Sequence, residues 1–308
     1  MITVQNIVNY DQIQPTAITI GTFDGVHIGH RKILKRLIKE AGAHDLKSTV
    51  LTFFPHPRMV LQKDADIKLL NTIEEKTKIL QEIGLDHLIV HPFTKEFSRL
   101  SATEFVRDVL VNALKAKKVI IGYDHRFGRN RNANINDLIA FGGLLDFEVE
   151  EIAVQEINEI SVSSTKIRKA LEAGEVAKAN KYLGYAYMLT GTVTKGKGLG
   201  RQIGFPTANI HIEESYKLVP KNGVYIIKST LKGIPVNGMM NIGYNPTVAG
   251  KGKSIEVHFF DYAQDLYGQK IQIDIVSRIR DEQKFDSIDA LKAQLKVDKQ
   301  TSLAKLNQ

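Results

Sequence analysis

The stretch G-T-F-D-G-V-H-I-G-H, residues 21–30, lies between a strand pattern and a helix pattern. Residues 17–20 are apolar and partly β-branched, and residues 30–42 carry apolar side chains at helical spacing. A glycine-bearing turn that leads into a helix presents free backbone N–H groups and the positive end of the helix dipole, which favour an anion. The stretch therefore predicts a strand–turn–helix unit with an anion site at the turn.

The two histidines of this stretch are separated by three positions, so on a helix they lie on one face. There His27 and His30 can donate hydrogen bonds to a phosphate whose charge grows during attack. A metal site is an alternative, but zinc needs a third protein ligand and spacing identifies none. Two surface histidines without a role are the other alternative. The stretch lacks G-x-G-x-x-G, so it is not a dinucleotide fingerprint.

Length and composition indicate the class of protein. The 308 residues suffice for about two domains, and 43% hydrophobic with 25% charged residues is typical of a soluble globular protein. No window approaches the ~20 apolar residues of a membrane span, and the N-terminus lacks a secretory signal. The absence of cysteine excludes disulfides and thiol chemistry. We expect a cytoplasmic protein without a membrane partner. Its net charge of +8 is compatible with nucleic acid or a polyphosphate as a partner, and also with a mildly basic surface that has no partner.

Strand and helix patterns alternate through residues 1–185. This alternation predicts an α/β domain with a doubly wound, Rossmann-like parallel sheet, whose ligands bind at the carboxyl ends of the strands. The predicted strands cover residues 17–20, 48–54, 87–91, 118–122 and 147–152, and the helices cover residues 30–42, 72–83, 102–114 and 135–145.

Residues 186–308 have a different pattern, with short β-rich runs separated by glycine-containing turns. It predicts a compact antiparallel β-barrel with a terminal helix over residues 288–295. Two helical patterns, 164–173 and 176–183, are expected to bridge the two domains. The predicted barrel strands cover residues 188–194, 224–230, 236–242, 255–260 and 271–279.

Four motifs of the first half resemble a known family. They are H-I-G-H at 27–30, T-F-F-P-H-P at 52–57, G-Y-D-H-R-F-G at 122–128 and S-S-T-K-I-R at 163–168. Together they resemble the FMN adenylyltransferase half of the prokaryotic bifunctional riboflavin kinase/FAD synthetase family. The resemblance implies transfer of AMP from ATP to FMN, with release of pyrophosphate. The loop R-N-R-N-A-N at 129–134 departs from the glycine-richer family pattern.

The resemblance also implies site residues in this half. His27, His30 and Arg168 are implied as catalytic. The implied ATP-binding residues are Gly21, Phe23, Asp24, Gly25, His27, Gly29, His30, Ser164, Thr165 and Arg168. The implied flavin-binding residues are Phe54, Pro55, Pro57, Asp124 and Phe127. Read alone, S-S-T-K-I-R could be a capped helix start and the Phe54–Pro57 segment a strand end with a rigid turn.

Three segments of the second half suggest another phosphate site. One of them is G-T-V-T-K-G-K-G at 191–198, which is not a P-loop, because Gly198 stands where that motif has a Ser or Thr hydroxyl for magnesium. Two interpretations remain for this segment: a glycine- and lysine-rich flap over a polyphosphate, or a surface hairpin without a ligand. In G-F-P-T-A-N at 204–209, Thr207 and Asn209 alternate on one face, where their oxygens suit Mg²⁺. Glu256, in I-E-V-H-F-F-D-Y at 255–262, is either a solvent-facing strand residue or a general base.

These segments resemble the riboflavin kinase domain of the same family. The resemblance implies Glu256 as the base acting on the riboflavin 5′-hydroxyl, with Mg²⁺ at Thr207 and Asn209. The implied ATP-binding residues are Gly196, Lys197, Gly198, Arg201, Thr207 and Asn209, and the implied flavin-binding residues are Arg280 and Phe285.

The leading hypothesis is a bifunctional enzyme with riboflavin, FMN and ATP as its substrates and no nucleic-acid partner. The sequence does not predict the oligomeric state. One alternative is another H-I-G-H nucleotidyltransferase, such as a synthetase-like protein acting on tRNA, but a lysine-rich second signature loop is missing. The other is a basic nucleic-acid-binding protein with an OB-like barrel. Such a protein would need stacking aromatic residues and a basic stripe, but tryptophan is absent and the aromatic residues sit singly.

Overall fold

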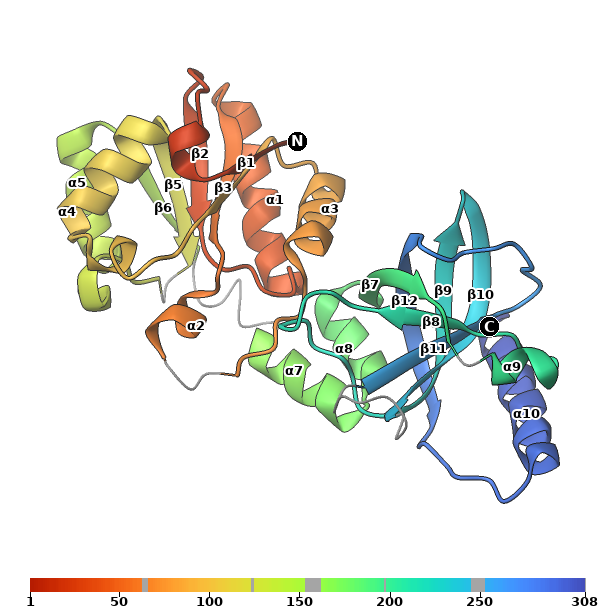
Figure 1. Cartoon of the computed structure of the whole chain (residues 1–308). Helices are drawn as coiled ribbons and strands as arrows, with labels where there is room; N and C mark the ends of the chain where they lie inside the picture. The colour runs from red at the N-terminus through yellow and green to blue at the C-terminus, as the bar shows by residue number, and fades with distance from the viewer. Residues whose placement is uncertain (63–65, 123–124, 153–161, 197, 245–252, 308) are drawn as a thin grey trace. The chain divides into compact units, whose positions relative to one another are not determined.

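The structure is a computed structural model that describes residues 1–62, 66–122, 125–152, 162–196, 198–244 and 253–307. The chain folds as two compact units, Met1–Ser163 and Ser164–Gln308. Figure 1 shows both units, with the colour running from red at the N-terminus to blue at the C-terminus. Within the described residues, no helix is both long enough and apolar enough to cross a membrane.

The first unit contains a six-stranded sheet in the order β1-β4-β3-β2-β5-β6, in which all neighbouring strands are parallel. Every residue of the central strand β2 is buried, which is typical of a strand covered on both faces. The sheet prediction is confirmed. The strands are β1 (Ile2–Gln5), β2 (Thr16–Ile20), β3 (Lys47–Phe53), β4 (His87–His91), β5 (Ala116–Gly122) and β6 (Glu148–Ile152).

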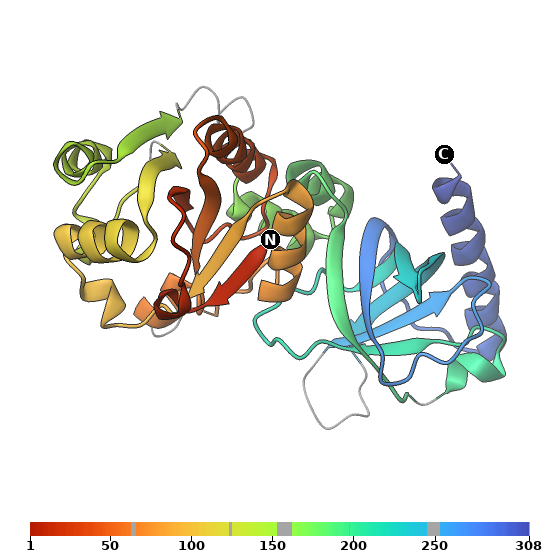
Figure 2. The ribbon, with the colours of Figure 1, turned by 90° about the horizontal axis from the view of Figure 1, so that it is seen from above.

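Helices cover both faces of this sheet, as Figure 1 and Figure 2 show. The helices α1 (Ile28–Ala43) and α3 (Ile73–Ile83) lie on one face, and the π-helical η3 (Phe105–Ala113) and α5 (Ile135–Leu145) lie on the other. The shorter helices are η1 (Ile7–Asn9), α2 (Pro57–Leu61), η2 (Phe97–Arg99), α4 (Ala102–Glu104) and η4 (Arg129–Arg131).

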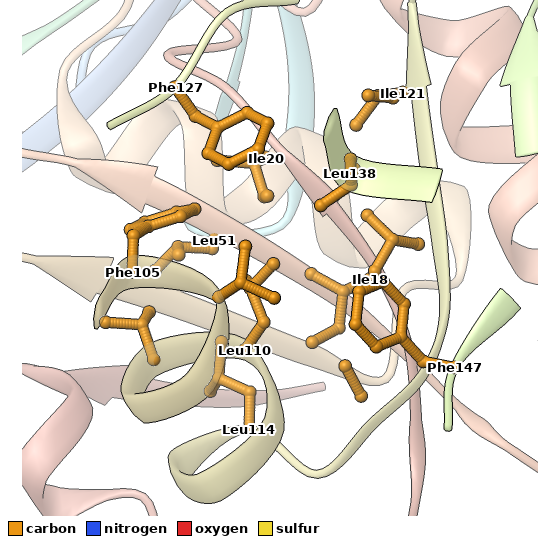
Figure 3. Close-up of a cluster of buried hydrophobic side chains, with 14 of the residues drawn as sticks. Ile18, Ile20, Leu51, Phe105, Leu110, Leu114, Ile121, Phe127, Leu138 and Phe147 are labelled. Carbon is orange, nitrogen blue, oxygen red and sulfur yellow. The ribbon is translucent and has the colours of Figure 1, made fainter. Parts of the chain in front are cut away.

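The core between the sheet and η3 holds the central strands in place (Figure 3). Ile18 and Ile20 of β2, Leu51 of β3 and Phe105 and Leu110 of η3 belong to one buried cluster. Burying each of these side chains contributes about 1.5–3 kcal/mol. The carboxyl end of β2, where the histidine stretch begins, is therefore anchored in the buried core.

The second unit is a closed antiparallel barrel in the order β10-β11-β8-β7-β12-β9, preceded by α7 (Ser164–Ala173) and α8 (Val176–Leu183). The barrel prediction is confirmed. Its strands are β7 (Tyr187–Thr194), β8 (Ala208–His211), β9 (Gly223–Leu231), β10 (Ile234–Tyr244), β11 (Lys253–Phe259) and β12 (Lys270–Arg280).

The terminal helix α10 (Ile288–Leu306) packs its leucines on the outside of the barrel, against a cluster that includes Phe205 and Phe260. It is longer than the predicted 288–295, because the buried Asp298 and Ser302 interrupt the apolar pattern with polar residues. The one-turn helix α9 (Leu199–Gln202), like β1 and β8, was too short to be predicted.

The two bridging helices are where they were predicted, but both belong to the compact unit of the barrel. The functional boundary at residues 185/186 stays a prediction.

Candidate active sites

The histidine stretch follows the strand at which the order of the first sheet reverses, because β3 pairs with one edge of β2 and β5 with the other. Open α/β sheets bind ligands at such a switch point, beyond the carboxyl ends of the strands. β2 ends at Ile20, and α1 begins at Ile28. The predicted strand–turn–helix unit is confirmed.

His27 caps α1, and its Nδ1 accepts a hydrogen bond from the backbone N–H of His30 at 3.3 Å. A neutral imidazole whose Nδ1 accepts carries its proton on Nε2, which is then a donor. The two rings are stacked, with centroids 3.6 Å apart and planes inclined by 16°. The Nδ1 of His30 is buried and has no hydrogen-bond partner among the described residues.

Burial makes both imidazoles weak bases. It lowers the pKa of His27 to about 4, an effect that the Asp24 carboxylate partly opposes. Burial, the neighbouring His27 and the Lys76 ammonium hold the pKa of His30 well below its usual range. Both rings are therefore neutral at pH 7. They can act as polar hydrogen-bond donors but not as permanent cations.

The turn before α1 has an unusual backbone. Phe23 and Val26 have φ angles of 43° and 33°, and Gly25 has a φ of 84°. A phenylalanine and a β-branched valine rarely adopt the left-handed region, so the surrounding structure must hold the turn in this shape.

Aromatic packing and two glycines shape the same turn. The ring of Phe23 contacts the ring of His30 edge-on, with centroids 5.2 Å apart. A Cβ on Gly21 would lie 3.1 Å from the Phe23 ring, and one on Gly29 would lie 3.3 Å from the His27 ring. The predicted ATP-binding residues of the first unit therefore form one local structure.

Lys76, which the sequence analysis did not identify, lies under this turn. Its Nζ donates a hydrogen bond to the carbonyl oxygen of Thr22 at 2.7 Å, and burial lowers its pKa to about 8. The buried Asp24 accepts a hydrogen bond from the Leu70 N–H at 2.9 Å. The spacing of Lys76 to Ile79 puts this lysine on the apolar face of α3, a sequence signal that could have identified it.

The predicted flavin-binding residues of the first unit fall into three groups. Phe54, Pro55 and Pro57 follow β3, whose carboxyl end lies beside that of β2. Phe127 is buried in the same core cluster as Phe105 (Figure 3). The centroids of the two rings are 5.9 Å apart. Asp124 lies outside the described residues. A flavin role for any of them stays a prediction.

Ser164, Thr165 and Arg168 occupy the first turns of α7, which belongs to the second compact unit. The alternative that S-S-T-K-I-R starts a helix is therefore correct as local structure. Thr165 is exposed and Arg168 is half-buried. Their assignment to the ATP site of the adenylyltransferase stays a prediction.

The predicted polar residues of the barrel lie on neighbouring strands. Asn209 of β8 is directly opposite Glu256 of β11, and Glu256 is opposite Asn241 of β10. Directly opposed residues share one face of a sheet, with Cβ atoms about 4.5–5.5 Å apart. Asn209, Glu256 and Asn241 therefore form a half-buried polar strip across three neighbouring strands. Thr207, also half-buried, lies immediately before β8, two residues ahead of Asn209. Asn241 had no predicted role.

The glycine-rich segment of the barrel touches this strip. An ideal Cβ on Gly196 would lie 2.0 Å from the Asn209 Nδ2, so no side chain fits there without displacing Asn209. Gly198 has a φ of 72° and caps α9, on which Arg201 is exposed. Lys197 lies outside the described residues.

Arg280, a predicted flavin-binding residue, is held by an ion pair. Its Nη2 lies 2.7 Å from Oδ2 of Asp298, and its Nε lies 3.0 Å from Oδ1. Asp298 is 1% exposed and also accepts a hydrogen bond from Gln294. The other predicted residue, Phe285, lies with its ring centroid 5.8 Å from the Arg280 guanidinium.

Comparisons with known proteins connect both sites to one family. The FAD synthetase family model matches residues 10–166, and the riboflavin kinase family model matches residues 183–306. The chain is 40% identical over 287 residues to the bifunctional riboflavin kinase/FMN adenylyltransferase of Listeria monocytogenes, covering 92% of this chain and 90% of that protein. The chain belongs to the bifunctional riboflavin kinase/FMN adenylyltransferase family.

Other members of this family are similar over nearly their whole length. The Escherichia coli K12 protein of the same name is 38% identical, covering 92% of this chain and 91% of that protein. The Haemophilus influenzae protein is 38% identical, covering 96% of each. The family and the enzyme class predicted from the motifs are confirmed.

A solved structure has the same fold. It is a crystal structure from Streptococcus pneumoniae titled as a macrolide-efflux protein, with a TM-score of 0.89 and 31% identity. The match covers 98% of this chain and 99% of that one.

Proposed function

We propose that this chain phosphorylates riboflavin with ATP to give FMN and ADP, and then transfers AMP from a second ATP to FMN, giving FAD and pyrophosphate. The observation that carries the proposal is that each family model covers one of the two residue groups described above. The histidine pair lies within residues 10–166, and the Asn209–Glu256 strip lies within residues 183–306. We assign adenylyl transfer to the former and phosphorylation to the latter.

In adenylyl transfer, an oxygen of the FMN phosphate attacks the α-phosphorus of ATP, and the bond from that phosphorus to the pyrophosphate oxygen breaks. No covalent enzyme intermediate is needed, so positioning and charge stabilisation carry the reaction. The neutral His27 and His30 donate hydrogen bonds to the phosphate oxygens. The free amides at the start of α1 add to this field.

The remaining predicted residues of this site are assigned by the family resemblance alone. Ser164, Thr165 and Arg168 bind the phosphates from a second segment, and the guanidinium of Arg168 suits two phosphate oxygens. Phe54, Pro55 and Pro57 lie against the flavin.

In the kinase reaction, the 5′-hydroxyl oxygen of riboflavin attacks the γ-phosphorus of ATP and ADP leaves. The Glu256 carboxylate accepts the hydroxyl proton. Its position opposite Asn209 places an acidic group beside a predicted phosphate site, which supports this role against that of a solvent-facing residue.

Mg²⁺ is the metal that the kinase site is expected to use. The described residues contain no cluster of three or more His, Cys, Asp or Glu side chains that could hold a metal ion. The hydroxyl of Thr207 and the amide oxygen of Asn209 are the hard oxygen donors that Mg²⁺ accepts, with phosphates and waters as its other ligands. The ion would neutralise phosphate charge there.

A chromatographic time course of riboflavin, ATP and Mg²⁺ with the purified protein tests the proposal. We expect FMN to appear first and then to convert to FAD. FMN without FAD, even from supplied FMN and ATP, would refute the assignment of the histidine site. The absence of any flavin product would refute both assignments.

The other sequence-based expectations are kept as part of this proposal. They are a functional boundary near residue 185, a cytoplasmic location and the lack of nucleic-acid and membrane partners.

A further inference from the structure

Lys76, on helix α3, forms a hydrogen bond with the peptide group between Thr22 and Phe23, near the start of the histidine turn. The side chain comes from α3, is 4% exposed, and donates from Nζ to the carbonyl oxygen of Thr22 at 2.7 Å. The same oxygen accepts a hydrogen bond from the Thr52 hydroxyl at 3.2 Å. Two elements outside the turn therefore fix the direction of one carbonyl group.

The direction of this carbonyl determines the direction of the next amide. The peptide bond between Thr22 and Phe23 is trans, and in a planar trans peptide the N–H points opposite to the C=O. The Phe23 N–H therefore points away from Lys76. This amide has no hydrogen-bond partner among the described residues. A free amide beside a helix N-terminus is a donor for an anion.

The charge of Lys76 acts on the same site. Asp24 of the turn and His30 of α1 are the charged or titratable groups that interact with it. The Lys76 ammonium and the second imidazole disfavour a proton on His30, in addition to burial. Lys76 thus supplies a positive charge beneath the turn without making the stacked rings cationic.

We propose that Lys76 is a positioning residue for adenylyl transfer, which orients the Phe23 amide toward the ATP phosphates and supplies a positive charge beneath the turn that binds them. The inference rests on the proposed function, because it assumes that the histidine pair contacts these phosphates. Lys76 would touch neither substrate, since its side chain is buried and its Nζ points at the Thr22 carbonyl beneath the turn.

Two variants separate the anchoring hydrogen bond from the charge. Lys76→Met removes both, whereas Lys76→Gln keeps a hydrogen-bond donor and removes the charge. Lys78→Met, an exposed position on the same helix, is the matched control. FAD formation from FMN and ATP is measured against pH, and FMN formation from riboflavin in the same chain is the internal reference.

For Lys76→Met we expect a loss of about 100-fold in kcat for FAD formation, since small displacements of positioned groups have effects of that order. FMN formation and the Lys78→Met variant should be unchanged. Wild-type FAD formation should decline above about pH 8 as Lys76 loses its proton, and Lys76→Gln should lack this decline. A lysine with a merely structural role would not affect that limb of the profile.

FAD formation within about threefold of wild type in both Lys76 variants would overturn the inference. Because FMN formation is assigned to the other compact unit, hydrogen exchange of β2 and α1 checks that the first unit is folded. If Lys76→Met loses this protection, the variant is misfolded and Lys76→Gln decides. Loss of the protection in Lys76→Gln as well would make Lys76 a folding residue and would likewise overturn the inference.

A wild-type chain that makes FMN but no FAD would instead refute the proposed function of the histidine site. An NMR titration of His30 still tests the inference in that case. Removal of the Lys76 charge should raise the pKa of His30, and an unchanged pKa in Lys76→Gln would overturn the role of the charge.

Discussion

The ion pair between Arg280 and Asp298 fixes the terminal helix to the last barrel strand. Asp298→Asn keeps the size of the side chain but removes its charge. In the wild type the carboxylate accepts hydrogen bonds from Nε and Nη2 of Arg280 and one from Gln294. The side chain of Asp298 is 1% exposed, so water cannot replace these partners.

The size of the effect follows from this burial. Removing one partner of a buried ion pair costs about 3–5 kcal/mol. Asparagine still offers one acceptor oxygen, and the Arg280 side chain is 20% exposed, so part of its charge can be hydrated. We therefore expect the barrel unit to lose about 2–3 kcal/mol of its free energy of unfolding.

Asp261→Asn is the matched control, since Asp261 is 89% exposed and lies 3.8 Å from Lys299 of the same helix. An exposed pair of this kind contributes about 0–1 kcal/mol. Hydrogen exchange measured by mass spectrometry resolves α10 and β12 from the first unit. Exchange of these segments should accelerate roughly 30- to 150-fold in Asp298→Asn and hardly at all in the control. Equal exchange in the two variants would refute the reasoning.

Four further predictions concern the two sites. Replacing His27 and His30 with alanine should abolish FAD formation and spare FMN formation, because only adenylyl transfer uses these donors; loss of both products in a folded chain would contradict the division of labour. Glu256→Gln should slow FMN formation by about 10²–10⁴-fold in a chromatographic assay, because it removes the general base, while supplied FMN should still be converted to FAD. Gly196→Ala should raise the KM for ATP of the kinase, since its Cβ would lie 2.0 Å from the Asn209 Nδ2, and an unchanged KM would argue against ATP there. The His27 imidazole should titrate near pH 4 by NMR, whereas the unfolded chain takes up this proton near pH 6.5. Its contribution to stability is thus complete above about pH 6.5 and is lost as the pH falls through 4, and a midpoint near 6.5 would show that the ring is solvated.

The sequence was sufficient for the architecture because strand and helix patterns report burial directly. β2 is fully buried, and the helical spacing of α1 begins directly after the turn at residues 21–27. The shortest elements were missed for the opposite reason. β8 has four residues and only one of them is buried, so its alternation is too weak to detect without its neighbours β7 and β11.

The site was predictable only where function is encoded in consecutive residues. The histidine stretch lies in one turn. Its glycines, Gly21 and Gly29, leave room for the rings of Phe23 and His27, which are neighbours in the sequence as well as in space. Lys76 and Asp298 act through partners that are far away along the chain, Thr22 and Arg280, and only the fold brings these pairs together. In both cases a charged residue stands at a buried position of a helix, where burial without a partner would be costly. A charge on the apolar face of a predicted helix therefore indicates a partner in another element. When that partner belongs to a functional motif, the buried charge is itself a candidate for a positioning role.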